Sequence, residues 1–180
     1  MNNRIFISLL LFTSLYSDAK MYVGVNYGNA IEKFTNLDAK SSGETITAKI
    51  GYGDIKAYAI ELSVDRIKNE SNIFSNSDGN RYSLNVELIK SFDFNTFLNP
   101  FFKLGFGTGG LKIDREIQDN LKYGSYNLGV GTFIPITNYI DLEIGYNYRY
   151  VSYEKIDIVV HATSYKSHLN TLYSGINIRF

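Results

Sequence analysis

The amino-acid sequence predicts an all-β protein, an eight-stranded antiparallel up-and-down β-barrel that crosses a membrane. Apolar side chains recur at every second position in eight segments, which is the period of a strand with two different faces. The joints between the segments alternate between long and short. An even number of strands with such joints places both chain ends and all the short joints at one end of a barrel.

Composition excludes several other classes of protein. The 180 residues hold 18 Lys+Arg against 18 Asp+Glu, and 15 Tyr and 12 Phe, but neither Cys nor Trp. A nucleic-acid-binding protein would carry a basic excess, so no nucleic-acid partner is expected. Without Cys there can be no disulfide, thiolate zinc site or cysteine nucleophile. No apolar run reaches the length of about 20 residues that a membrane-spanning helix needs.

Residues 1–19 have the layout of a secretory signal peptide. Arg4 gives a positive start, residues 5–16 are mostly apolar, and Ser17 and Ala19 put small residues where a signal peptidase would cut. The apolar stretch is too short to span a membrane as a helix. We therefore expect an exported protein, with a single barrel domain over residues 20–180.

The eight expected strands follow one another after residue 20. The first has Met21, Val23, Val25 and Tyr27 on one face. The last has Leu172, Ile176, Ile178 and Phe180 at positions of the same parity, so they also share one face. In chain order the alternating segments are 21–27, 46–52, 58–64, 82–88, 102–108, 126–132, 140–150 and 172–180.

The joints divide into two sets. The long, polar joints are 29–43, 67–80, 111–122 and 152–164, and they are expected to form four external loops. The short joints are 54–56, 93–99 and 135–138. Pro100 and Pro135 lie at or beside short joints, where the missing backbone N–H does not interrupt a sheet.

The two faces of the strands differ in a way that favours a membrane barrel. The apolar face carries a charge only at strand ends, at Arg66 and Lys90, where long side chains can reach the headgroups. The opposite face carries 11 of the 15 glycines, which would give room in a narrow lumen. It also carries nine charged residues, which we expect to form ion pairs in that lumen: Lys49, Glu61, Asp65, Glu87, Lys103, Asp141, Glu143, Arg149 and Arg179.

Tyrosines concentrate toward the strand ends, where aromatic side chains would stand at the lipid headgroups. They are Tyr27, Tyr52, Tyr58, Tyr82, Tyr148 and Tyr150. A soluble, secreted ligand-binding barrel is the alternative, because it would bury the same apolar face.

The signal peptide, the eight strands, the alternating joints and the terminal Phe180 together resemble the small outer-membrane proteins of the OmpA, OmpX and opacity-protein type. The resemblance covers residues 20–180 and rests on patterns. It implies location in the cell outer membrane, contact with outer-membrane lipid and lipopolysaccharide, and insertion by the barrel-assembly machinery. It also implies that this machinery recognises the C-terminal signal Leu172, Ile176, Ile178 and Phe180.

Three motifs could indicate chemistry, and none predicts a cofactor or a metal. Gly105, Gly107 and Gly110 satisfy a dinucleotide-binding spacing, but no helix or βαβ unit follows. His161 and His168, the two histidines, lack further ligands at a matched spacing. Asp141 and Glu143 could serve as acid and base, yet ion pairing with nearby cations is favoured.

We therefore predict a non-enzymatic outer-membrane barrel with a role in envelope integrity or in surface interaction through its four external loops. A small passive channel is the first alternative, although eight strands leave an interior that side chains can fill. A lipid-A-modifying enzyme that uses His161 near the outer rim, with Glu154 or Asp157 close to it, is the second.

Overall fold

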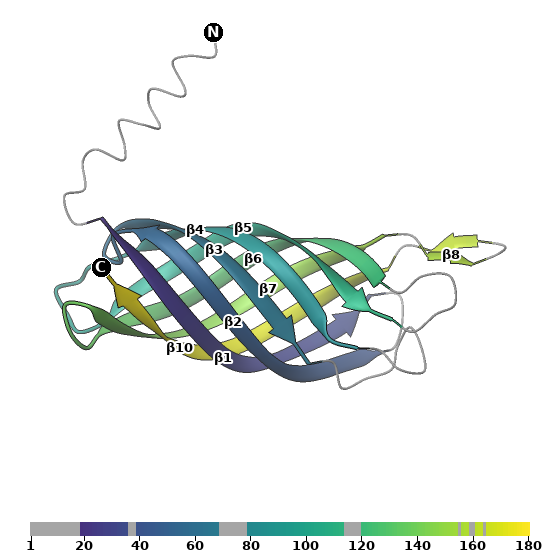
Figure 1. Ribbon diagram of the computed structural model, residues 1–180, viewed down its shortest axis with the longest axis horizontal. Helices are drawn as coiled ribbons and strands as arrows, with labels where there is room; N and C mark the ends of the chain where they lie inside the picture. Colours follow the sequence, from purple (N-terminus) through teal and green to yellow (C-terminus); the bar gives the residue numbers. More distant parts are fainter. Residues whose placement is uncertain are drawn as a thin grey trace, which may run out of the picture.

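A computed structural model of the chain shows a closed antiparallel barrel, which confirms the predicted fold class (Figure 1). The structure describes residues 19–35, 39–68, 79–113, 120–154, 156–158, 161–163 and 165–180. The barrel strands are β1 (Lys20–Phe34), β2 (Lys40–Gly53), β3 (Tyr58–Ile67), β4 (Arg81–Ser91), β5 (Asn99–Lys112), β6 (Asn120–Pro135), β7 (Ile140–Tyr153) and β10 (Lys166–Arg179). Each strand pairs with its neighbours in the chain, and β1 closes the barrel against β10. The predicted signal peptide lies outside the described residues, except for its last residue.

None of the described residues belongs to a helix that is long and apolar enough to cross a membrane.

Several strands run further than the sequence predicted. The joint expected at 29–43 is reduced to residues 35–39, because β1 continues to Phe34 and β2 begins at Lys40. Many of the residues added to these strands are polar, whether they face the lumen or the outside. The apolar–polar alternation is therefore lost there, although the backbone pairing of β1 with β2 continues. The prediction of a long first joint was therefore wrong.

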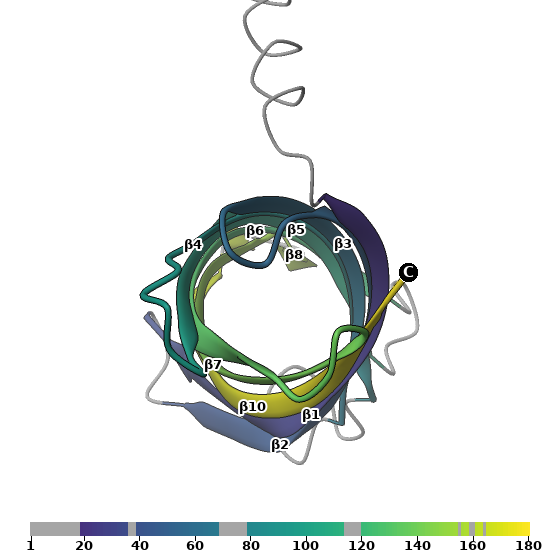
Figure 2. The same ribbon diagram turned by 90° about the vertical axis from the view of Figure 1, so that its left-hand side faces the viewer.

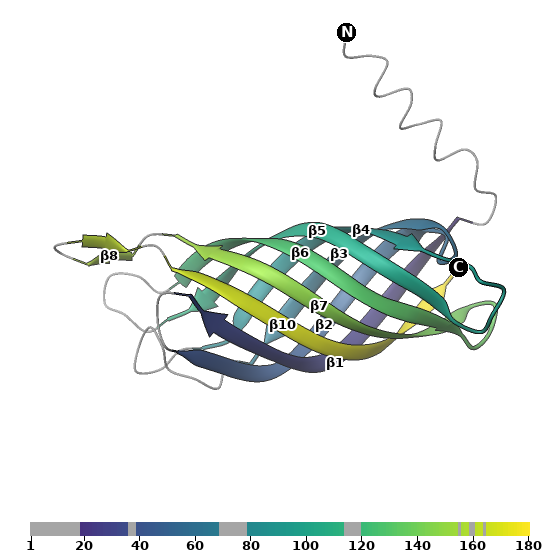
Figure 3. The same ribbon diagram turned by 180° about the vertical axis from the view of Figure 1, so that it is seen from behind.

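The expected joint at 152–164 contains a small hairpin of its own. β8 (Ile156–Ile158) pairs with β9 (His161–Thr163) in a separate two-stranded sheet, which projects beyond the barrel in Figures 1 and 3. The backbone of His161 lies in this hairpin, opposite Ile158. Of the predicted site around His161, the side chains of His161 and Asp157 lie outside those that the structure describes, and Glu154 Oε1 accepts a hydrogen bond from the Lys122 amide at 2.8 Å.

The two ends of the barrel differ. The first residue of β1, Lys20, and the last residue of β10, Arg179, lie at the end of the barrel that carries the short turns 54–57, 92–98 and 136–139 (Figures 1 and 3). We call this end the turn end. The opposite end, where β1 is connected to β2, β3 to β4, β5 to β6 and β7 to β10, is the loop end. In outer-membrane barrels the turn end faces the periplasm.

The turns do not all fold in the same direction. Figure 2 looks onto the turn end and shows the connection between β2 and β3 bending across the mouth, whereas the connection between β4 and β5 projects outside the ring of strands. The inward bend carries Ile55, which is only 3% exposed. The barrel is therefore covered in part by its own turn at this end.

Outward and inward positions alternate along every barrel strand. The outward side chains form an apolar wall, with Val25, Leu88, Leu104 and Ile176 each exposed by half or more. The inward positions are buried and include many polar and charged side chains. An apolar surface around a polar interior is the arrangement of a barrel in lipid.

Candidate functional site: the packed barrel interior

Apolar side chains close the interior at both ends. At the turn end the buried residues Tyr22, Ile55, Ala59, Ile89, Phe101 and Phe133 pack together. At the loop end a larger group is formed by Ala30, Phe34, Ile67, Leu111, Ile113, Leu121, Tyr123, Val151, Tyr153 and Leu169. Seven charged side chains are buried between these two layers: Lys49, Glu61, Asp65, Glu87, Lys103, Glu143 and Arg149.

Two lysines and two glutamates form a cross-lumen cluster just inside the turn-end layer. Lys103 Nζ lies 3.0 Å from Glu61 Oε1 and 2.9 Å from Glu143 Oε1. Lys49 Nζ lies 3.0 Å from Glu61 Oε2 and also contacts Glu143. Each lysine thus bridges both carboxylates, and the side chains come from β2, β3, β5 and β7. The sequence predicted these residues as lumen charges but could not predict which cation meets which carboxylate.

Neutral donors complete the cluster. The Tyr22 hydroxyl donates to Glu61 Oε2 at 2.9 Å, and the Tyr173 hydroxyl donates to Glu143 Oε1 at 2.9 Å. Asn177 Nδ2 donates to Glu143 Oε2 at 3.0 Å. Buried charges are tolerated only when their remaining hydrogen-bonding capacity is used, and these donors fill that capacity. The cluster therefore ties six strands of the barrel together.

Glu87 is a further buried carboxylate of the lumen, and its hydrogen-bond partners are amides and not lysines. Asn127 Nδ2 donates to its carboxylate at 3.3 Å, and Asn147 lies at the limit of a hydrogen bond, 3.5 Å. Within the part of the chain that the structure describes, no Lys or Arg nitrogen lies within 4.0 Å of Glu87. Glu87 is thus the one predicted lumen charge that has amide partners in place of an ion pair.

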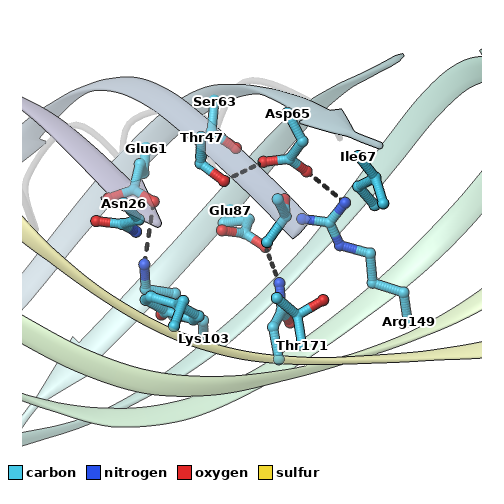
Figure 4. Close-up of a pocket in the computed structure, with 13 residues that line it drawn as sticks. Asn26, Thr47, Glu61, Ser63, Asp65, Ile67, Glu87, Lys103, Arg149 and Thr171 are labelled. Atoms are coloured by element: carbon cyan, nitrogen blue, oxygen red, sulfur yellow. Dashed lines mark hydrogen bonds and ion pairs between the residues drawn. The ribbon is translucent and has the colours of Figure 1, made fainter. Parts of the chain in front are cut away.

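An ion pair between Asp65 and Arg149 crosses the lumen nearer the loop end. Thr47 Oγ1 donates to Asp65 Oδ1 at 2.6 Å, and Asn85 Nδ2 donates to Oδ2 at 2.9 Å. The Ser83 hydroxyl lies between the two charges: it donates to Asp65 at 3.0 Å and accepts from Arg149 at 3.2 Å. Figure 4 shows Asp65 and Arg149 reaching toward each other from opposite sides of the lumen.

A further ion pair, between Glu32 and Arg81, was missed by the sequence analysis. Arg81 contacts Glu32 and lies 5.5 and 5.6 Å from the ring centroids of Tyr123 and Tyr153. The Tyr153 hydroxyl also donates to Glu32, at 2.8 Å. Continuing the inward parity from Asn26 to Glu32, and from Ser83 back to Arg81, would have found both residues.

The remaining predicted lumen charges lie at the turn end. Arg179 Nε lies 2.7 Å from Asp141 Oδ2, and its Nη2 donates to Oδ1 at 2.8 Å. Asp141 is fully buried, while Arg179 keeps partial contact with solvent. This pair lies on neighbouring strands, β7 and β10, and does not cross the lumen.

Many inward glycines lie against a large side chain of another strand. A Cβ atom at Gly51 would lie 2.1 Å from Tyr22 Cζ, and one at Gly145 would lie 2.5 Å from the Tyr173 hydroxyl. The same relation joins Tyr123 to Gly109, Phe101 to Gly131, Asn177 to Gly24, Asn26 to Gly175, Asn85 to Gly107 and Glu87 to Gly105. The absence of a Cβ at these glycines leaves room for the neighbouring side chains, so a narrow barrel can be filled.

Little free space remains in the lumen. A cavity of about 20 Å³ is lined by Asn26, Glu61, Asp65, Glu87 and Arg149, among other residues (Figure 4). A cavity of this size holds about one water molecule. No group of three or more His, Asp or Glu side chains suited to a metal ion occurs in the described parts of the chain. The polar interior holds the strands together, and this cavity among the described residues is too small for a substrate.

The predicted C-terminal residues and the second histidine lie on the outer wall. Leu172, Ile176, Ile178 and Phe180 are outward and about half exposed or more, and the Phe180 amide donates to the Met21 carbonyl at 2.9 Å. His168 lies outward on β10, where its Nδ1 is 2.6 Å from the Tyr148 hydroxyl.

A closed eight-stranded barrel with an apolar outer wall and an ion-paired interior defines the class of small integral β-barrel proteins of the outer membrane. The sequence profile described as "Outer membrane protein beta-barrel domain" matches residues 7–180, and the chain belongs to this family. Its location is the outer membrane. A sequence comparison with curated proteins finds no match.

Solved structures share the fold. The crystal structure of Neisserial surface protein A (NspA) has a TM-score of 0.72 at 19% identity, over 90% of this chain and 99% of that chain. Ail, the attachment invasion locus protein of Yersinia pestis, in complex with the heparin analogue sucrose octasulfate, has a TM-score of 0.56 at 13% identity, over 88% and 98%. The N-terminal barrel of Pseudomonas aeruginosa OprF has a TM-score of 0.51 at 13% identity, over 86% and 96%. At these identities the similarity concerns the fold.

Proposed function

We propose that the protein is a non-enzymatic outer-membrane barrel that supports the envelope by binding lipopolysaccharide, and that its external loops meet other surfaces. The observation that carries this proposal is a basic collar on the outer surface at the loop end. The collar consists of seven exposed cationic side chains: Lys33, Lys40, Arg66, Lys68, Lys112, Lys122 and Lys166. The loops themselves connect β1 to β2, β3 to β4, β5 to β6 and β7 to β10.

The collar is asymmetric with respect to the membrane. Among the described residues, Glu44 and Glu154 are the acidic side chains that accompany it on the outer surface. At the turn end, the exposed or half-exposed lysines Lys20, Lys56 and Lys90 are accompanied by Asp54 and Asp93, and Lys56 pairs with Asp93 at 3.2 Å. Among the side chains that the structure describes, the excess of cations on the outer wall at the loop end matches an outer leaflet whose lipid carries phosphate groups.

The structure of Ail with a heparin analogue shows a polyanion on a barrel of this fold. The collar favours a polyanionic partner for the present protein as well, and lipid A, with its phosphates, is the polyanion that we propose. The test is retention of purified lipopolysaccharide by a variant with Lys33, Lys112, Lys122 and Lys166 replaced by Gln. The control replaces Lys20 and Lys56, at the turn end, by Gln. We expect weaker retention and a lower salt dependence in the collar variant alone. Equal retention by both variants would contradict the proposal.

A passive channel is the second candidate, because the lumen is lined with polar groups between its closed ends. The two apolar layers and the cross-lumen cluster leave a cavity of about 20 Å³, which argues against flux of solutes. Planar-bilayer recording of the folded barrel tests this directly. We expect no steady conductance from the wild-type protein, and a sustained open state would favour the channel.

A further inference from the structure

The turn between β4 and β5 is unusually apolar for a connection at an aqueous end. Residues 92–98 read FDFNTFL, and Phe92, Phe94 and Phe97 are 45%, 65% and 72% exposed. Figure 2 shows this connection outside the ring of strands, in contrast to the turn that carries Ile55 inward. Adjacent exposed aromatic rings, such as those of Phe92 and Phe94, indicate a surface that is covered by something other than water, whereas a single exposed Phe does not.

The turn has a defined shape, so its side chains point in definite directions. The Asn95 amide donates to Asp93 Oδ1 at 2.8 Å, and Asn95 takes a left-handed conformation with φ of 56°. Asp93 also pairs with Lys56 of the neighbouring turn at 3.2 Å. The Asn95 amide and the Lys56 ammonium together hold the pKa of Asp93 below its usual range, so this carboxylate stays charged and turned toward the other turns.

Phe92 and Phe94 lie on the opposite side of the turn from Asp93. Phe92 continues the outward row of β4 beyond Leu88 and Lys90, and its ring stacks on Phe94 with centroids 6.4 Å apart. Lys90 Nζ lies 3.8 Å from the centroid of Tyr58 and 5.6 Å from that of Phe92. The apolar surface therefore continues without a break from the lipid-facing wall, with one ammonium group set among aromatic rings.

Phe97 lies apart from this surface. It lines a basin of about 510 Å³ between the three turns, together with Ile55, Lys56 and Tyr139. The turn is thus divided into an outer side, with Phe92 and Phe94, and a basin side, with Thr96 and Phe97.

We propose that Phe92 and Phe94 form an aromatic foot that inserts into the periplasmic leaflet, with Lys90 meeting the phospholipid phosphates. We assign the lipid–water interface as the partner of this foot because the foot extends the wall that already faces lipid. Lys90 is also a cation that can reach the headgroups from an apolar surface. The remaining turns fold over the lumen mouth or carry no stacked aromatic pair among their described residues, so the foot is on one side of the barrel. This goes beyond the proposed function, which concerns the opposite leaflet.

The chain has no Trp, so a single introduced Trp reports on one position. We would reconstitute Phe92→Trp and Phe94→Trp in phosphatidylcholine–phosphatidylglycerol vesicles with acyl chains brominated near the headgroup. Phe97→Trp is the matched control in the same turn, and Leu88→Trp is the control inside the wall. Each variant is first shown to be folded by its shift in mobility on boiling.

The expected result is a blue-shifted emission and strong loss of fluorescence in brominated vesicles for the two foot positions and for Leu88→Trp. Phe97→Trp should keep its fluorescence in brominated vesicles and should be quenched by acrylamide in the aqueous phase. If the foot variants respond as Phe97→Trp does, the turn faces water and the proposal is overturned. Should a Trp variant fail to fold, Phe94→Cys with a nitroxide label decides the same question, since the chain has no other Cys. Greater access to oxygen than to a water-soluble nickel complex supports insertion, and the reverse refutes it.

Discussion

The cross-lumen cluster makes a quantitative prediction about Glu143. Its carboxylate accepts from four groups: Lys103 and Tyr173 at Oε1, and Lys49 and Asn177 at Oε2. The substitution Glu143→Gln keeps the shape of the side chain but replaces one oxygen by an NH₂ group. Whichever way the amide is turned, that NH₂ faces two donors.

The loss can be estimated from these contacts. Two hydrogen bonds to a charged acceptor disappear, each contributing about 1.5–3 kcal/mol. The cluster is also left with two ammonium groups and one carboxylate in a water-excluded lumen. Breaking a buried pair by removing one partner costs about 3–5 kcal/mol, and we expect Glu143→Gln to fall in this range.

The assay is the folded fraction along a urea series in lipid vesicles, read from the mobility of the unboiled protein on a detergent gel. The control is Lys56→Gln, which removes an ion pair at the solvent-exposed turns and should lower stability by less than about 1 kcal/mol. Adding Lys49→Met to Glu143→Gln balances the charge and should restore part of the stability. If Glu143→Gln is as stable as Lys56→Gln, the cluster does not hold the barrel together and the reasoning fails.

Three further predictions follow from the wall, the C-terminus and the loop hairpin. Gly51→Ala should lower stability by about 1–3 kcal/mol, because the added Cβ displaces Tyr22, whereas Gly124→Ala, with its nearest neighbour at 4.0 Å, should have little effect in the same urea assay. Phe180→Ala should reduce the amount of folded barrel in cells but not refolding of the urea-denatured protein into detergent; equal loss in both would show a defect in stability and not in assembly. His161→Ala should leave lipid A unchanged by mass spectrometry, and an altered lipid A would revive the enzyme alternative.

The sequence predicted the two faces of the wall because alternation is a local property. Inside the bilayer, Val25 and Leu104 face lipid while Lys49 and Lys103 face the lumen, so the contrast between successive residues is large. Beyond the apolar zone the outer face also becomes polar, and the contrast vanishes. The ends of β1 and β2 were read as a loop for this reason, and Glu32 was missed with them.

Other features depend on contacts between residues far apart in the chain. Ile55 belongs to a short polar joint, and its burial under the barrel mouth follows from the direction in which that turn bends. Glu87 and Glu61 are equivalent in sequence pattern, yet one is bonded to amides and the other to two lysines. The choice of partner depends on the stagger of the strands around the closed barrel, which alternation does not specify.

The fit of side chains against glycines has a consequence for strand register. A slip of one residue between β1 and β2 would turn apolar side chains inward, but a slip of two residues would keep every side chain on its own face. In the observed register Tyr22 lies opposite Gly51, and Gly24 opposite Lys49. A two-residue slip in one direction would set Tyr22 against Lys49, and in the other it would set Gly24 against Gly51 and leave a hole. The volumes of the side chains in the lumen therefore select one register among the pairings that the alternation of apolar and polar residues alone would allow.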